Sequence, residues 1–234
     1  MEAEIVFNKF LKKYFGEILI LLFITFLITG PFLTDLTVSL MAILALFKIY
    51  KNKKIFYKNW LFITFIIWNI FIILISLTSN NVLLSLESSL FYFRFGLFSI
   101  FFYLVLINCS NIFHTILLIT LLSILAFVAY DGIIQYIFGV DLFGIRADIG
   151  SYTRISGLFG EELIMGSFLS RTYPFVFFLF LYTKKKSSFF NYIFFLISIF
   201  VLFAVLLSGE RAAIFNIILF LLITILLTKG LNQI

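Results

Sequence analysis

Residues 184–211 read KKKSSFFNYIFFLISIFVLFAVLLSGER: three lysines, an apolar run without charge and a short polar turn. The apolar run from Phe189 to Leu207 has 19 residues, and a helix needs about 20 to cross the ~30 Å hydrocarbon layer of a bilayer. Lysines in the loops of membrane proteins concentrate on the cytoplasmic side. We therefore predict a spanning helix with a cytoplasmic lysine end and an outward-facing Glu210-Arg211 end.

The rest of the chain repeats this pattern. Hydrophobic residues make up 63% of the sequence, charged residues 12%, and the mean hydropathy is +1.19, which excludes a water-soluble domain. With an even number of crossings, all lysine clusters and both termini lie on the cytoplasmic side. The sequence thus predicts an all-α polytopic membrane protein with one transmembrane domain over residues 1–234. Its eight predicted spans cover residues 16–31, 33–50, 59–77, 88–107, 112–131, 162–183, 189–207 and 212–228.

The longest predicted outer connection runs from Asp131 to Glu161, about 30 residues. Structureless loops longer than roughly 12–15 residues are usually functional or disordered, and the apolar content of this one argues against disorder. We expect its first part, 133–143, to lie in the plane of the membrane interface. The glycine-punctuated stretch 145–160 that follows is where a substrate would be handled.

Several classes of function are disfavoured by composition. The net charge of +6 is explained by the lysine clusters, and no basic helix with interleaved aromatics indicates nucleic-acid binding. The single Cys109 has no disulfide or CxxC partner. One histidine and one cysteine do not make a His/Cys metal site, and there is no P-loop or dinucleotide fingerprint. We expect neither a metal nor a cofactor.

All the arginines lie outside the lysine clusters, at positions where a planar, permanently charged donor suits phosphate or carboxylate. For Arg154 and Arg211 ligand contact is the favoured interpretation. Arg94 either snorkels to the interface from within the fourth span or contacts ligand. Arg171, deep in the sixth span, either pairs with a carboxylate or contacts ligand. Arg146 is the least constrained and is either solvated or a ligand contact.

The carboxylates near these arginines carry two interpretations. Spacing within the sixth span puts Glu162, Gly166 and Leu169 on one helix face. Glu162 then acts either as a general base or, the favoured reading, as a partner that orients an arginine. Glu210 carries the same two alternatives.

Two stretches carry a family resemblance. They are RISGLFGEELIMGSFLSR at 154–171 and SGERAA at 208–213. Together with YFRF at 92–95, they resemble the bacterial O-antigen polymerase and O-antigen ligase family. The spacing from Arg146 to Gly157 echoes an arginine–glycine spacing discussed for the polymerases.

The resemblance implies a polytopic glycosyltransferase of the bacterial inner membrane. Such enzymes take a glycan from an undecaprenyl-pyrophosphate carrier on the periplasmic side and pass it to another carrier-linked glycan or to lipid A-core. They use no nucleotide sugar and no obligatory metal. Family members continue through a large periplasmic loop, so we expect this chain to match the N-terminal portion of that fold.

The resemblance also implies roles for the candidate residues. Arg154 and Arg211, with Arg94 or Arg171, would hold the pyrophosphate and stabilise it as a leaving group. The candidates for the catalytic role are Arg154, Arg211, Glu162 and Glu210, and those for substrate binding are Arg94, Arg171, Arg146, Gly157 and Gly160.

Two other functions stay open at this point. A flippase or transporter for lipid-linked oligosaccharide would also place arginines in a membrane cavity, although it should show paired inverted segments with broken helices. A non-catalytic membrane partner in polysaccharide assembly is the third possibility.

Overall fold

The structure, a computed structural model, describes residues 2–51, 60–146, 154–160, 162–183 and 187–231. The regular elements within these residues are all helices, and the described residues contain no strand and a single isolated β-bridge, between Val140 and Arg146. The chain divides at Cys109 into two units, residues 1–109 and 110–234, which are described separately.

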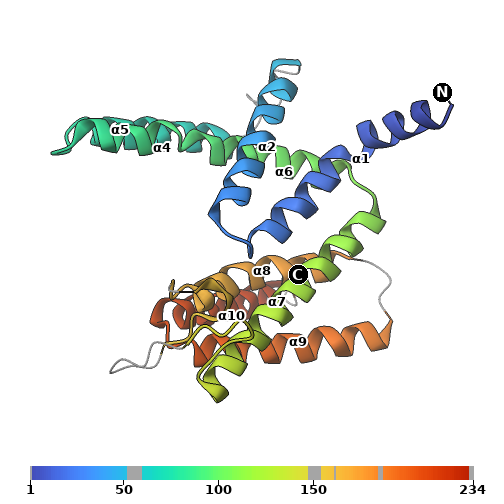
Figure 1. Cartoon of the computed structure of the whole chain (residues 1–234). Coiled ribbons are helices and arrows are strands. Elements are labelled where there is room, and N and C mark those ends of the chain that lie inside the picture. Colours follow the sequence, from blue (N-terminus) through green and yellow to red (C-terminus); the bar gives the residue numbers. More distant parts are fainter. Residues whose placement is uncertain (1, 52–59, 147–153, 161, 184–186, 232–234) are drawn as a thin grey trace. The chain divides into compact units, whose positions relative to one another are not determined.

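The first unit consists of α1 and α2, which are antiparallel neighbours, and of α4, α5 and α6 (Figure 1). Pro31 begins α2, where its fixed φ and missing N–H suit the first helical position, directly after Gly30 with φ +128°. The core lies where α2 crosses α6, around the buried side chains of Met41, Ala45 and Phe101. The helices are α1 Glu2–Phe26, α2 Pro31–Lys51, α4 Trp60–Ser76, α5 Val82–Leu90 and α6 Phe93–Asn108.

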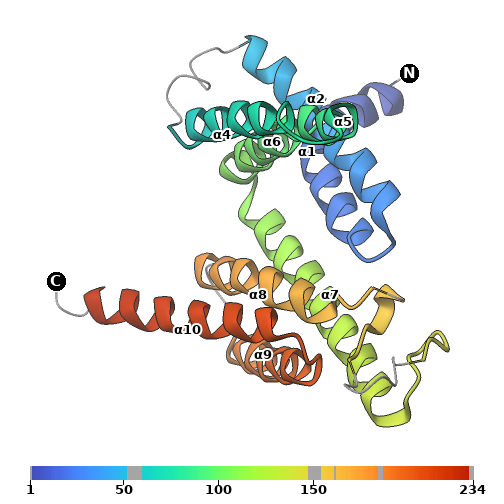
Figure 2. The ribbon, with the colours of Figure 1, turned by 90° about the vertical axis from the view of Figure 1, so that its left-hand side faces the viewer.

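The second unit is built around α7, which packs against α8 and α9, while α8 also packs against α10 (Figure 2). Ser110 caps α7 by accepting a hydrogen bond from the N–H of Phe113, and Ser187 caps α9 in the same way through Phe190. Leu125 and Val128 of α7 are fully buried. The elements are α7 Asn111–Phe138, the short 3-10 helix η1 Gly157–Phe159, α8 Met165–Tyr182, α9 Ser188–Leu207 and α10 Arg211–Leu231.

The helices have the length and surface of a membrane protein. Within the described residues, four helical stretches are long and apolar enough to cross a bilayer: Pro31–Tyr50, Val82–Asn108, Asn111–Phe138 and Ser188–Leu207. Shorter apolar helices cover Tyr14–Phe26, Phe62–Ser76 and Arg211–Leu227. Large apolar side chains such as Phe195 and Leu226 face outward, 62% and 69% exposed, as lipid contact requires. The all-helical membrane class is confirmed, and eight crossings with cytoplasmic termini stay a prediction.

The boundary of the fifth predicted span was wrong. Residues 133–138, the first part of the stretch 133–143 expected to lie in the interface plane, form the end of α7. The helix continues because its apolar pattern continues, and it ends where Gly139 adopts φ +75° and donates its N–H to the carbonyl of Gln135. The connection between α7 and α8 therefore begins at Gly139 rather than at Asp131.

Two further boundaries differ from the predictions. The sixth predicted span begins at Met165, so Glu162 precedes α8 and does not share a helix face with Gly166 and Leu169. The fourth predicted span is preceded by α5 and interrupted by a turn at Phe91 and Tyr92. Residues 91–92 and 162–164 contain no proline or glycine, so the sequence gives no signal for either boundary.

Candidate functional site

The N-terminus of α8 is capped by a carboxylate from another part of the chain. The residue at its N-cap position, Ile164, has no side chain able to cap the helix. Instead, Glu210 Oε1 accepts a hydrogen bond from the N–H of Gly166 at 2.8 Å. Glu210 Oε2 accepts one from the N–H of Ser167 at 3.1 Å and another from its hydroxyl. A negative charge at this position is stabilised by the orphan N–H groups and by the helix dipole.

Close backbone contact supports this arrangement. Ser208 is fully buried against Gly166, and a Cβ added to Gly166 would overlap the Ser208 hydroxyl. The Ser208 hydroxyl also accepts a hydrogen bond from the N–H of Glu210 at 3.3 Å. The turn at 208–210 is thus held against the first turn of α8 by the Glu210 carboxylate, and the lack of a side chain at Gly166 leaves room for this close approach.

A second set of hydrogen bonds joins the connection between α7 and α8 to α7 itself. The side chain of Gln135 is fully buried, and its Oε1 accepts hydrogen bonds from the N–H groups of Ser156 at 3.0 Å and Gly157 at 2.9 Å. Its Nε2 donates to the carbonyl of Ile145 at 3.3 Å. One amide therefore fixes both arms of the connection.

Asp131, one turn before Gln135 on α7, is the second buried polar group facing this connection. Its Oδ1 accepts a hydrogen bond from the N–H of Leu142 at 3.0 Å, whereas its Oδ2 is buried without a hydrogen-bond partner among the described residues. Gly157 lies beside it with φ +54°, and a Cβ there would stand 3.1 Å from Asp131 Oδ2. Glycine is required at 157 both by the backbone conformation and by this contact.

These contacts bring two of the residues that the sequence singled out, Gly157 and Glu210, to the first turn of α8. Gly157 packs against Met165, the first residue of α8, and Ser208 packs against the next residue, Gly166. The segment that begins at Arg154 and the turn that ends at Arg211 therefore both lie against the first turn of α8.

The individual candidates differ in exposure. Arg154 is half-buried, and its Nε has no hydrogen-bond partner within the described part of the chain. Arg211 begins α10 and is exposed, as are Arg171, one turn beyond Ser167 on α8, and Glu162. The exposed guanidinium groups and the Glu162 carboxylate are accessible to a ligand, whereas the buried Glu210 carboxylate is already engaged.

The two remaining candidates between α7 and α8 lie close to Ile145, a residue that Gln135 contacts. Arg146 is exposed and bridges Val140 through its backbone. Gly160 has φ +64° and lies beside the side chain of Ile145. Both take part in shaping the connection.

Arg94 belongs to the first unit and has a partner there. It is the second residue of α6, not a residue deep inside an unbroken fourth span. Its Nη2 forms an ion pair with Asp35 Oδ2 at 2.8 Å, and its Nη1 lies 3.5 Å from the Ser39 hydroxyl. The contacts of Arg94 are thus with α2, inside the first unit.

The structure thus places the Glu210 carboxylate at the N-terminus of α8, whereas Arg171, Arg211 and Glu162 are exposed and form no ion pair with one another among the described residues. Within the residues that the structure describes, no three His, Cys, Asp or Glu side chains gather as metal ligands would. No protein family, curated protein or solved structure matches the chain.

Asp131 and Gln135 were missed by the sequence analysis. They were assigned to the border of a loop, although their i, i+4 spacing in an apolar helix is a signal for two polar side chains on one face. A predicted helix that continues to Gly139 places Asp131 and Gln135 on one face of that helix.

Proposed function

We propose that this chain acts in the assembly of a bacterial surface polysaccharide. It moves a glycan from undecaprenyl pyrophosphate to an acceptor hydroxyl at the periplasmic face of the inner membrane. The acceptor is another carrier-linked glycan or lipid A-core. The proposal rests on the resemblance of 154–171 and 208–213 to the O-antigen polymerase and ligase family.

One structural observation supports this proposal above the others. The two stretches that carry the resemblance are far apart in the sequence, yet Glu210 of one accepts hydrogen bonds from Gly166 and Ser167 of the other. A shared site for two motifs requires contact of this kind. The contact leaves Arg211 exposed at the start of α10, beside the first turn of α8.

The arginines have distinct roles in this proposal. A diphosphate that links a glycan to a lipid tail lies at the membrane interface, and guanidinium groups bind phosphate oxygens in a bidentate manner. Arg154 and Arg211 hold the diphosphate and stabilise the charge that develops on it when the glycosidic bond breaks. Arg171 and Arg146 add positive charge on either side.

The carboxylates have separate roles in this proposal. Glu210 is a positioning residue, because its oxygens are occupied by the first turn of α8. Glu162 is exposed and orients an arginine. Alignment of the acceptor hydroxyl supplies a large part of the remaining rate.

The test is the glycan ladder of lipopolysaccharide in cells that produce the protein with Arg154→Ala or Arg211→Ala. Each variant is expected to shorten or abolish the ladder and to accumulate untransferred carrier-linked glycan. Lys186→Ala, which removes a positive charge from the predicted cytoplasmic side, is the matched control. Unchanged ladders at equal protein levels would contradict the proposal, and loss of carrier translocation would favour a flippase instead.

A further inference from the structure

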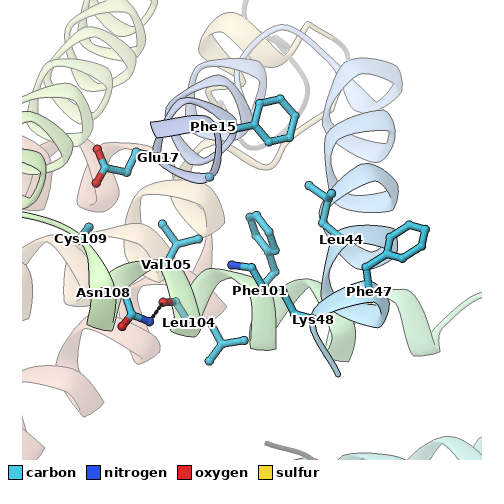
Figure 3. A pocket seen from close by; sticks show the side chains of 11 residues that line it. Phe15, Glu17, Leu44, Phe47, Lys48, Phe101, Leu104, Val105, Asn108 and Cys109 are labelled. Atoms are coloured by element: carbon cyan, nitrogen blue, oxygen red, sulfur yellow. Dashed lines mark hydrogen bonds between the residues drawn. The ribbon is translucent and has the colours of Figure 1, made fainter. Parts of the chain in front are cut away.

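The first unit contains a pocket that the proposed function does not use. It has a volume of about 320 Å³ and lies between α1, α2 and α6 (Figure 3). Its polar lining includes Glu17 from α1, Lys48 from α2 and Asn108 from α6, and the ring of Phe101 forms part of its wall. Pockets that hold small ligands begin at about this size and combine apolar walls with a few polar groups.

The pocket carries one positive and one negative group on different helices. The ammonium of Lys48 lies 4.7 Å from the centroid of the Phe101 ring, within the range of a cation–π contact. Glu17 is half-buried, and Figure 3 shows its carboxylate at one end of the pocket, directed away from Lys48. Among the described residues these two groups form no ion pair with each other. The pocket therefore presents separate sites for an anion and a cation and has no net formal charge.

The pocket lies at the ends of apolar helices. The apolar part of α1 begins at Tyr14, shortly before Glu17, and Lys48 is close to the end of the spanning stretch Pro31–Tyr50. Asn108 is the last residue of α6. Charged groups at such positions lie at the depth of lipid headgroups in a bilayer.

The rim of the pocket is apolar. Phe15 and Phe47, which also line it, are 42% and 63% exposed. Exposed aromatic rings beside the polar groups can contact the acyl chains of a molecule whose headgroup enters the pocket. The ligand expected from this arrangement is an amphiphile with both charges in its polar part.

We propose that this pocket binds the phosphoethanolamine headgroup of a phospholipid, with the phosphate at Lys48 and the ammonium at Glu17. A primary ammonium donates hydrogen bonds to a carboxylate, whereas the quaternary ammonium of a choline headgroup has no N–H to donate. A glycerol headgroup supplies no cation for Glu17. The inference does not depend on the proposed function, because it uses residues of the first unit alone.

The experiment is native mass spectrometry of the full chain released from micelles that contain phosphatidylethanolamine, phosphatidylcholine or phosphatidylglycerol. Retention of phosphatidylethanolamine is expected to exceed that of the other two. Glu17→Gln should lower its affinity about tenfold, the change expected for loss of a charge-assisted hydrogen bond, and abolish its advantage over phosphatidylcholine. Lys48→Gln should weaken the binding of all three lipids.

Matched controls separate the pocket from general charge effects. Glu87→Gln removes an exposed carboxylate from α5 of the same unit, and Lys51→Gln removes a positive charge from the end of α2. Both should keep the preference. Soluble phosphoethanolamine, added to the protein with its bound phospholipid, should not displace that phospholipid, because it lacks acyl chains to contact the rim.

Three outcomes would overturn the proposal. The first is equal retention of the three lipids, and the second is a preference that survives both pocket variants. Displacement by soluble phosphoethanolamine at equal concentration would assign the pocket to a free metabolite instead. None of these outcomes bears on the glycan ladder, so the two proposals fail independently.

Discussion

Glu210 and Gly166 are joined by a hydrogen bond of 2.8 Å between a carboxylate oxygen and a backbone N–H, although 44 residues separate them in the sequence. This bond and those to Ser167 provide the cap that α8 lacks locally. The turn after α9 therefore determines how α8 begins. A substitution at Glu210 or at Gly166 should alter the packing of the other residue.

Replacing Glu210 by alanine should destabilise the second unit by about 1–3 kcal/mol, because buried N–H groups of α8 would lose their acceptor. Glu210→Gln, which keeps one acceptor oxygen and loses the charge, should cost less. Thermal unfolding in detergent measures both. The matched control is Glu162→Ala, which removes an exposed carboxylate that precedes the same helix. Equal effects at 162 and 210 would contradict the capping role.

Gly166→Ala should destabilise the protein by about 1–3 kcal/mol through overpacking, because the new methyl group meets Ser208. Ser208→Gly removes the atoms in conflict, so the double variant should recover part of the loss. The unfolding temperatures of the two single variants and the double variant give the coupling. Strict additivity would show that the two residues do not determine each other's packing.

Gln135→Ala should loosen the segment that begins at Arg154. Losing the acceptor of two buried N–H groups costs about 1–2 kcal/mol, so trypsin should cut after Arg154 roughly 5–30 times faster. Fragment masses identify the cleaved bond. Tyr136→Ala alters the neighbouring, exposed position on α7 and should leave the rate unchanged. If both variants are cut at the parent rate, Gln135 does not hold this segment.

The ion pair between Arg94 and Asp35 should contribute little to stability. The two side chains are 28% and 53% exposed, so the coupling from a double-mutant cycle should be at most about 1 kcal/mol. The single variants Arg94→Ala and Asp35→Ala, together with their combination, provide that cycle. The coupling should decrease as salt is added. A coupling that is larger and independent of salt would mean that the pair is sequestered from water.

Cys109 should react slowly with thiol reagents at neutral pH. Burial raises the pKa of its thiol, and the nearby Glu17 carboxylate raises it further; Glu17 and Lys48 are the charged groups that line the pocket beside it. Because the thiolate is the reactive form, labelling should become fast only above the ordinary thiol pKa. Glu17→Gln should lower the pKa and speed labelling, and Glu87→Gln should not. Because Cys109 is the single cysteine of the chain, the amount of maleimide bound to the protein measures the labelling of this residue.

The sequence predicted each helix better than its ends. Each of the eight predicted spans overlaps a helix of the structure, whereas their number as membrane crossings stays a prediction. Apolar length did not place the start of α8, because the cap there comes from Glu210, a residue distant in the sequence. Nor did it place the end of α7: the predicted span ends at the polar Asp131, whereas the helix continues to Phe138 and is capped at Gly139.

The candidate site shows the same division. Gly157 and Arg211 could be selected from residue type and motif, because glycine and arginine have distinctive chemistry. The contacts of Gln135 and Glu210 could not, since a local pattern does not reveal which backbone groups a buried side chain will meet. Residues that hold a site in place are found only once the chain has been folded around them.

The capping of α8 by Glu210 also fixes an order of events during synthesis. The ribosome makes Gly166 44 residues before Glu210, an interval of about 2–9 seconds at roughly 5–20 residues per second. Throughout that interval the nascent first turn of α8 lacks its carboxylate acceptor. The N-terminal cap of α8 is therefore completed only after α9 has been synthesised, so the later part of the chain finishes the earlier helix.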